Sequence, residues 1–210
     1  MTLVLDGTNR ITATELNDTL DLSSKTLTLP AENQSPMQVI SSSDTYTTGA
    51  STFDVDLPTD SSYRQFKLII TGFYGSVGYD SYVRVRLDGN TGYEQGASDY
   101  KFVVSETNNT GGTGRTTSTG SNVMRTCWYG LGDSDGEAVD WEIDIYNSNN
   151  STHYFRLHSR YGGCISNAEP VVGQSTGQYN FGSLVDGIRI FPSTGTISWR
   201  SYTLYGVKRS

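Results

Sequence analysis

Apolar and polar residues alternate along much of the chain, with the period of two that a half-buried β-strand requires. Four runs show the alternation most clearly: Phe53–Leu57, Tyr63–Ile70, Tyr82–Leu87 and Ala138–Tyr146. In each run the apolar residues fall on one face and the polar residues on the other. The pattern therefore predicts strands that each cover a hydrophobic core with one face.

Weaker alternation predicts further strands at 37–40, 100–104, 123–129 and 154–161. Near the C-terminus, Asp186–Lys208 alternates on both sides of Pro192–Gly195. Proline presets φ in such a turn, and glycine accepts a positive φ without steric cost. We therefore expect this stretch to form a β-hairpin that closes a sheet.

Three stretches are expected to be loops. Residues 105–122 contain no apolar side chain, while 72–79 and 162–183 are rich in glycine. Helical periodicity is limited to one turn at Thr14–Asn17. About eight strands separated by turn signals predict an all-β fold, an antiparallel β-sandwich of the jelly-roll type.

The pattern divides the chain into three parts. Residues 1–34 are expected to form a short extended β arm, because Leu27 and Leu29 alternate with threonines before Pro30. This arm has too few apolar residues for a core of its own and must dock on a larger body. Residues 35–50, with a Ser/Thr-rich run, form a connector, and 51–210 form the sandwich domain.

Composition narrows the classes of partner. Hydrophobic residues make up 35% and charged residues 18% of the chain, which suits a sheet protein with many turns. The net charge of −7 argues against nucleic acid or an anionic membrane as partner. The sequence has neither a secretory signal nor 18 consecutive apolar residues, so we expect synthesis in a cytoplasm and no membrane span.

Two cysteines, Cys127 and Cys164, leave two readings open: one disulfide, or two free thiols. Neither is spaced from another cysteine or a histidine as zinc ligands are. No cofactor-binding motif is present either, since the Gly-rich run Gly111–Arg115 lacks the lysine of a phosphate-binding loop. We therefore expect no cofactor and no zinc.

The chain resembles the β-sandwich modules of tailed-bacteriophage virion proteins, such as tail fibres, head fibres and decoration proteins. Three stretches carry the likeness: YRQFKLIITGF at 63–73, VRVRLDGNTGYEQGASDY at 83–100, and VDGIRIFPSTGTISWRSYTLYGVK at 185–208. The segment LDLSSKTLTLP at 20–30 is similar to the arms that precede the first module of phage fibres. The resemblance implies a location in the virion and a homo-oligomer, with a trimer favoured.

Candidate catalytic and metal sites are sparse. Glu142 and Asp144 form an i, i+2 carboxylate pair, a feature of glycosidases, but a half-buried strand produces the same polar face. Asp133–Glu137 offers oxygen ligands for Ca²⁺ on a turn, although Asp-Gly is also ordinary turn chemistry. His153 and His158 are five apart and cannot act as a pair on a strand. We expect no catalytic residue and no metal ligand.

Tyrosines give the strongest surface signal. Tyr74, Tyr79, Tyr93 and Tyr100 lie in or beside Gly/Asn-rich loops, where aromatic rings suit stacking on sugars or packing at interfaces. Capping of the sandwich ends is the structural alternative.

Two functions follow as hypotheses. The first is a non-enzymatic structural protein of a phage virion (fibre, appendage or decoration protein), anchored to other virion proteins through residues 1–34. The second is a lectin-like module that binds a host glycan through the tyrosine loops. A polysaccharide-degrading enzyme ranks third.

Overall fold

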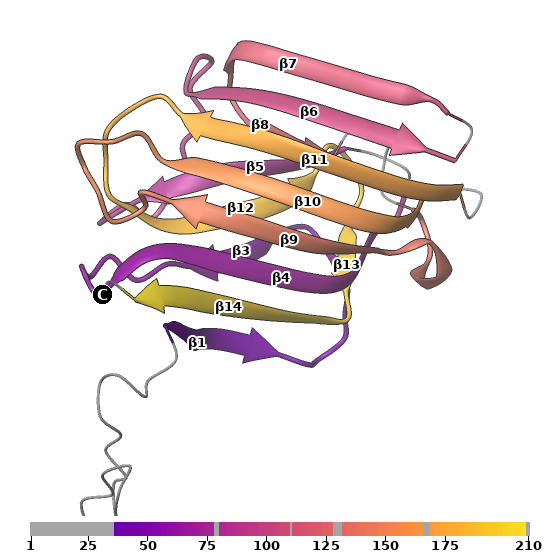
Figure 1. Ribbon diagram of the computed structural model, residues 1–210, viewed down its shortest axis with the longest axis horizontal. Helices are drawn as coiled ribbons and strands as arrows, with labels where there is room; N and C mark the ends of the chain where they lie inside the picture. The colour runs from indigo at the N-terminus through magenta and orange to yellow at the C-terminus, as the bar shows by residue number, and fades with distance from the viewer. Residues whose placement is uncertain (1–35, 78–79, 110, 128–131, 166–168, 209–210) are drawn as a thin grey trace, which may run out of the picture. The chain divides into compact units, whose positions relative to one another are not determined.

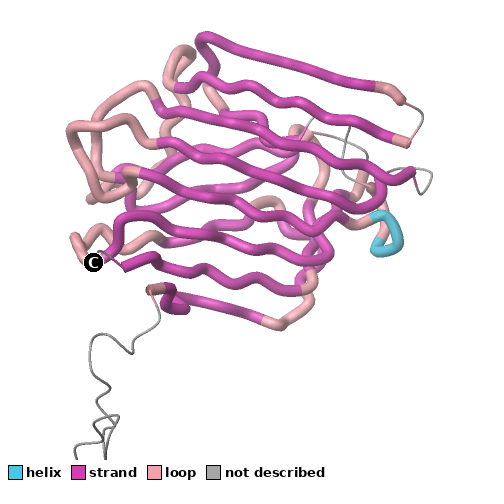
Figure 2. Tube along the Cα trace, in the orientation of Figure 1, coloured by secondary structure: helices cyan, strands magenta, loops and turns pink. Residues whose placement is uncertain are grey.

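The computed structural model describes residues 36–77, 80–109, 111–127, 132–165 and 169–208. Within them the chain forms two antiparallel sheets that enclose one core, and the helical part is a short 3-10 turn, η3 (Asp135–Glu137), drawn in cyan in Figure 2. The expected all-β antiparallel sandwich is confirmed. The expected arm at 1–34 lies outside the described residues.

The larger sheet has ten strands, eight of which lie side by side in Figure 1. Their order is β1 (Met37–Ser43), β14 (Ser201–Lys208), β4 (Tyr63–Gly75), β9 (Val139–Tyr146), β10 (Arg156–Ile165), β11 (Glu169–Tyr179), β6 (Tyr100–Asn108) and β7 (Thr113–Ser121). The other two are β13 (Ile197–Trp199), which pairs with β4, and β2 (Thr47–Ala50), which pairs with β13. The smaller sheet has the order β3 (Phe53–Asp56), β12 (Val185–Pro192), β5 (Ser81–Leu87) and β8 (Met124–Cys127).

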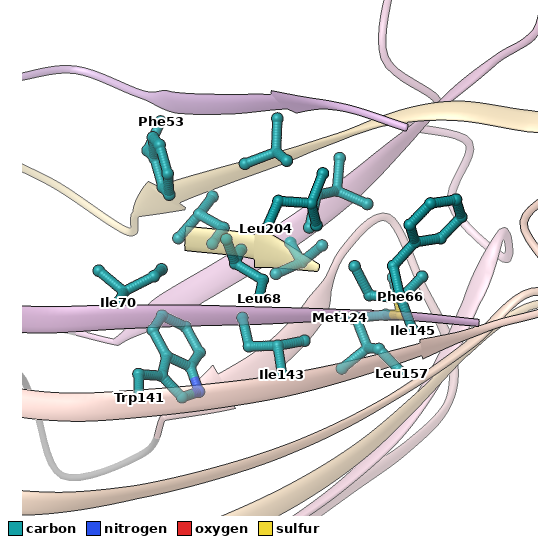
Figure 3. Packing of buried hydrophobic residues seen from close by; sticks show 14 of the residues in the cluster. Phe53, Phe66, Leu68, Ile70, Met124, Trp141, Ile143, Ile145, Leu157 and Leu204 are labelled. Atoms are coloured by element: carbon teal, nitrogen blue, oxygen red, sulfur yellow. The ribbon is translucent and has the colours of Figure 1, made fainter. Parts of the chain in front are cut away.

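The alternation seen in the sequence sets the core. On β9 the residues Val139, Trp141, Ile143 and Ile145 are buried, and the polar residues between them face outward, as predicted. Leu68 and Ile70 of β4 and Leu204 of β14 meet them from the same sheet, and Phe53 faces them from the smaller sheet (Figure 3). Each buried aliphatic or aromatic side chain contributes about 1.5–3 kcal/mol of transfer free energy.

Three stretches expected to be loops contain strands instead. Residues 105–122 complete β6 and form β7, which pair with each other as a hairpin. Residues 162–183 carry the end of β10 and all of β11. Residues 72–75 extend β4 to Gly75. The first two were missed because Gly, Ser and Thr occupy many of their inward positions, so the two-residue alternation of hydrophobicity is absent.

The closing hairpin was also predicted incorrectly. The two strands β12 and β14 lie in different sheets: β12 pairs with β3 and β5, and β14 pairs with β1 and β4. The turn at Pro192–Gly195 and the short β13 carry the chain from one sheet to the other. Both strands therefore lie in the interior of a sheet, which explains their strong alternation.

The stretch expected to be a connector contributes two strands. Its residues form all of β1, the edge of the larger sheet next to β14, and all of β2, which pairs with β13. β1 has few apolar residues because it is an edge strand with an exposed outer face. Val39 on this strand is 53% exposed.

Candidate functional site

The larger sheet carries an open depression on its outer face, with a volume of about 770 Å³. We call this depression the trough. It crosses five adjacent strands, β4, β9, β10, β11 and β6. Because neighbouring strands lie about 4.8 Å apart, four spacings give a length of about 19 Å. The residues that line it are Ile69, Thr71, Ser105, Glu106, Thr107, Asp140, Trp141, Glu142, Arg160, Tyr161, Gly162, Val172, Gly173 and Gln174.

Strand register organises these residues into a floor and two walls. The floor follows one line of paired residues at inward-facing positions: Trp141, Tyr161, Gly173 and Glu106. The first wall is the outward-facing row Ile69, Glu142, Arg160, Gln174 and Ser105. The second wall contains Thr71, Asp140, Gly162, Val172 and Thr107.

The predicted carboxylate pair lies on the outer face of β9, beside the trough, and both members are ion-paired. Lys67 Nζ is 3.2 Å from Glu142 Oε2 and 3.0 Å from Asp144 Oδ1. Arg160 Nη2 lies 3.1 Å from Glu142 Oε2 and 3.6 Å from Asp144 Oδ2. Partial burial lowers the pKa of Lys67, but hydrogen bonds with Asp144 and Glu142 outweigh it and leave that pKa raised.

Asp140, in the second wall, is held by the backbone of β4. Its Oδ1 accepts a hydrogen bond of 3.0 Å from the Gly72 N–H. Gly72 has φ +60° and lies where the register between β4 and β9 shifts. Glycine adopts this left-handed conformation without the penalty that a Cβ imposes, so the backbone donor is placed by a residue suited to the bulge.

A buried polar cluster lies on the core side of the trough floor. Tyr161 OH donates to Glu106 Oε2, and Cys127 Sγ lies 3.8 Å from the same oxygen. Glu106 is 1% exposed, Cys127 2% and Tyr161 4%. Burial, followed by the charge of Glu106, raises the pKa of the Cys127 thiol. Burial likewise raises the pKa of Tyr161. The cluster joins β6 and β10 of one sheet to β8 of the other.

Sequence reasoning missed this cluster, because Glu106 was assigned to a polar loop. The available signal was its spacing: Glu106 continues the inward parity of Tyr100 and Val104 on β6. Both cysteines are free thiols in the structure, so the disulfide reading is wrong.

The predicted tyrosines that the structure describes, Tyr74, Tyr93 and Tyr100, do not share a surface. Tyr74 hydrogen-bonds through its hydroxyl to Tyr46 OH. Tyr79 lies outside the described residues. Tyr100 is fully buried; its hydroxyl donates to Glu94 O at 2.9 Å and accepts from Val85 N–H at 3.0 Å. The expected exposure of Tyr100 is therefore wrong: it points from β6 into the core.

Tyr93 packs on the outer face of the smaller sheet. The guanidinium of Arg189 lies 4.2 Å from its ring centroid, and that of Arg86 lies 5.8 Å away. Arg189 also forms a bidentate ion pair with Asp54, with N–O distances of 2.7 and 2.6 Å. A tyrosine ring in this position serves a cation–π contact within the chain.

The turn at Asp133–Glu137 is held by internal contacts. The Asp135 carboxylate accepts hydrogen bonds of 3.0 and 2.6 Å from Arg200, which lower the pKa of Asp135. Glu137 Oε2 accepts from Asp133 N–H at 3.2 Å. Across the described residues, no group of three or more His, Cys, Asp or Glu side chains is arranged to hold a metal ion.

The two histidines have separate surroundings. His158 lies on β10 and packs edge-on against Tyr146, with ring centroids 5.5 Å apart. His153 precedes the strand, and its Nδ1 lies 3.0 Å from Thr152 Oγ1.

Comparison with protein-family models, with curated proteins and with solved structures finds no match to this chain. In the part of the chain that the structure describes, no helix is long and apolar enough to cross a membrane. The case for a function therefore rests on the fold, the trough and the residues themselves.

Proposed function

We propose that the chain is a non-enzymatic structural protein of a tailed-bacteriophage virion, of the fibre, appendage or decoration type. In this proposal residues 1–34 anchor the sandwich to other virion proteins, and the sandwich associates with copies of itself, with a trimer favoured. The resemblance at 63–73, 83–100 and 185–208 and the two-sheet sandwich support the proposal.

The observation that carries the anchoring role is the self-sufficiency of the sandwich core. The core that the structure describes is built between Ile40 and Leu204, and its strands pair into two sheets. This core is formed by described residues of the sandwich itself. In this proposal residues 1–34 bind a neighbouring subunit.

The absence of catalysis in this proposal rests on the state of the carboxylates. A glycosidase needs one carboxyl group as a proton donor and a second as a nucleophile or base. Glu142 and Asp144 instead share the cations Lys67 and Arg160. Both carboxylates are thus engaged by cations of the chain itself.

Deletion of residues 1–34 tests the anchoring role. The shortened chain should unfold at the same urea concentration as the full chain, but it should be missing from virions purified after infection. A full-length variant with the first 34 residues in scrambled order is the matched control for length and composition, and it should also be missing. Virions that contain the shortened chain at the normal level would refute the anchoring role.

Carbohydrate recognition through the tyrosine loops gains no support from the geometry. Tyr100 is buried, Tyr93 is covered by Arg189, and Tyr74 is bonded to Tyr46. A glycan cannot stack on the buried ring of Tyr100 or on the face of Tyr93 that Arg189 covers, and Tyr79 lies outside the described residues.

A further inference from the structure

The trough is long, open and lined by closely spaced polar groups. Its walls run at right angles to the strands, because each wall takes one residue from each of five neighbouring strands. The second wall is interrupted at Gly162, which has no side chain. A linear ligand of several repeating units fits such a channel better than a compact ligand does.

The backbone around the trough is already occupied by sheet hydrogen bonds. Strands β4, β9, β10, β11 and β6 are each paired on both sides. A peptide that binds a sheet usually adds to an open edge. There its backbone N–H and C=O groups form hydrogen bonds with those of the edge strand. A peptide lying across these strands would need side chains to satisfy its own N–H and C=O groups. A polyhydroxylated chain has no such backbone requirement, and its hydroxyls both donate and accept.

The charges of the walls argue against an anionic ligand. Asp140 and Glu142 contribute two carboxylates, and Arg160 contributes one guanidinium that is already paired with Glu142. Nucleic acids and acidic polysaccharides need an excess of cations along their path. Carboxylate, guanidinium and amide groups are all planar, and each can form hydrogen bonds with two adjacent hydroxyls at once.

Two apolar side chains complete the lining. Ile69 lies in the first wall on β4, and Val172, which is 62% exposed, lies in the second wall on β11. They offer contact for the C–H faces of sugar rings. The trough therefore combines hydrogen-bonding forks with small apolar areas along its length.

We propose that the trough binds a linear, uncharged oligosaccharide that runs across the strands, with Arg160 and Gln174 as central hydrogen-bonding residues. This ligand site goes beyond the structural role and does not depend on it. Its location also differs from the tyrosine loops.

Gly162→Val is the sharpest test of the proposed site. A Cβ at Gly162 would meet only Val171 O within 4 Å, at 3.8 Å, so the backbone has room for a side chain to begin there, and valine is expected to fill the gap in the second wall. Valine is also well suited to a strand. Thr117→Val on the exposed outer face of β7, outside the trough lining, is the matched control.

The full chain is applied to a glycan array that carries linear neutral and uronic-acid oligosaccharides of increasing length. We expect binding to neutral chains that strengthens with length, a loss of at least roughly tenfold in Gly162→Val, and no loss in Thr117→Val. Arg160→Ala, at a side chain that is 64% exposed, should lose a similar factor without unfolding.

Three outcomes would overturn the proposal: no neutral glycan bound by the unchanged chain, preferential binding of uronic-acid chains, or full binding by Gly162→Val. Incorporation of Gly162→Val into virions is measured in parallel. It should be normal, which separates the ligand site from the anchoring role of residues 1–34.

Discussion

The hydroxyl of Tyr161 on β10 donates to the buried carboxylate of Glu106 on β6, although β11 lies between these two strands. The residue of β11 in register with both is Gly173. A Cβ built on Gly173 would overlap Tyr161 Cζ. The tyrosine ring thus occupies the space that a side chain of β11 would otherwise fill. Its hydroxyl supplies a hydrogen-bond donor to the Glu106 side chain, which is buried away from water.

Gly173→Ala should therefore be strongly destabilising for a single added methyl group. The new Cβ must displace the Tyr161 ring, which overpacks the core and weakens the bond to a buried charged group. We expect a loss of about 2–3 kcal/mol in the free energy of unfolding, measured by urea denaturation. Gly92→Ala is the control, because no atom lies within 4 Å of a Cβ there. That variant should stay within about 0.5 kcal/mol of the unchanged chain. Equal stability of the two variants would contradict the role assigned to Gly173.

Alkaline pH should destabilise the fold through its buried tyrosines. Burial raises the pKa of Tyr100 and Tyr161 above the usual 10.0, and it raises the pKa of Tyr179 to about 12. The unfolded chain then loses these protons first. Stability is fully present below about pH 10 and falls above it, by up to about 1.4 kcal/mol per pH unit for each tyrosine.

Urea denaturation at a series of pH values from about 9 to 11 measures this slope. Tyr179→Phe should reduce the slope of stability against pH by the contribution of one tyrosine. This change in slope is expected whatever the effect of the substitution on stability at neutral pH. A stability that is constant over this range would show that these hydroxyls ionise equally in the folded and unfolded chains.

Periodicity located the strands whose inward positions are aliphatic or aromatic, such as β9 and β4. It failed on β11, where Gly173, Ser175 and Gly177 face the core. At those positions the volume is supplied by neighbours, Tyr161 at Gly173 and Met124 at Gly177. A small residue in a strand is thus explained by a large side chain from another strand that fills the space beside it. The local sequence does not show which distant side chain that will be.

The trough was beyond sequence reasoning for a related reason. The alternation correctly predicted that Glu142 and the other polar residues of β9 lie on the outer face of the sheet. Its partners Lys67 and Arg160 come from the strands on either side. Strand order is set by which faces and edges pack best in the whole sandwich, so the residues that line a site across five strands become known only with the topology.

Arg189→Lys should be costly although it keeps the charge. The guanidinium stacks on Tyr93 and bonds both oxygens of Asp54, and a lysine ammonium can reproduce neither the planar stack nor the fork. We expect a loss of about 1 kcal/mol, since these side chains remain partly exposed to solvent. Arg115→Lys on the outer face of the edge strand β7 is the control and should be neutral. Thermal unfolding of the two variants under identical conditions decides the matter, and equal midpoints would refute the role of the stack.

The Cys127 thiol should react with alkylating reagents only when the protein unfolds. It is 2% exposed, and burial together with the charge of Glu106 raises its pKa, so the reactive thiolate is scarce. In a Cys164→Ser background, labelling of Cys127 by iodoacetamide should be negligible in buffer and should follow the global unfolding curve as urea is added. Mass spectrometry of the intact chain gives the labelled fraction. The Cys127→Ser variant, which keeps Cys164 at an intermediate exposure, shows how fast a less buried thiol of this chain reacts. Labelling of Cys127 in buffer at that same rate would mean that the core side of the trough floor opens locally without global unfolding.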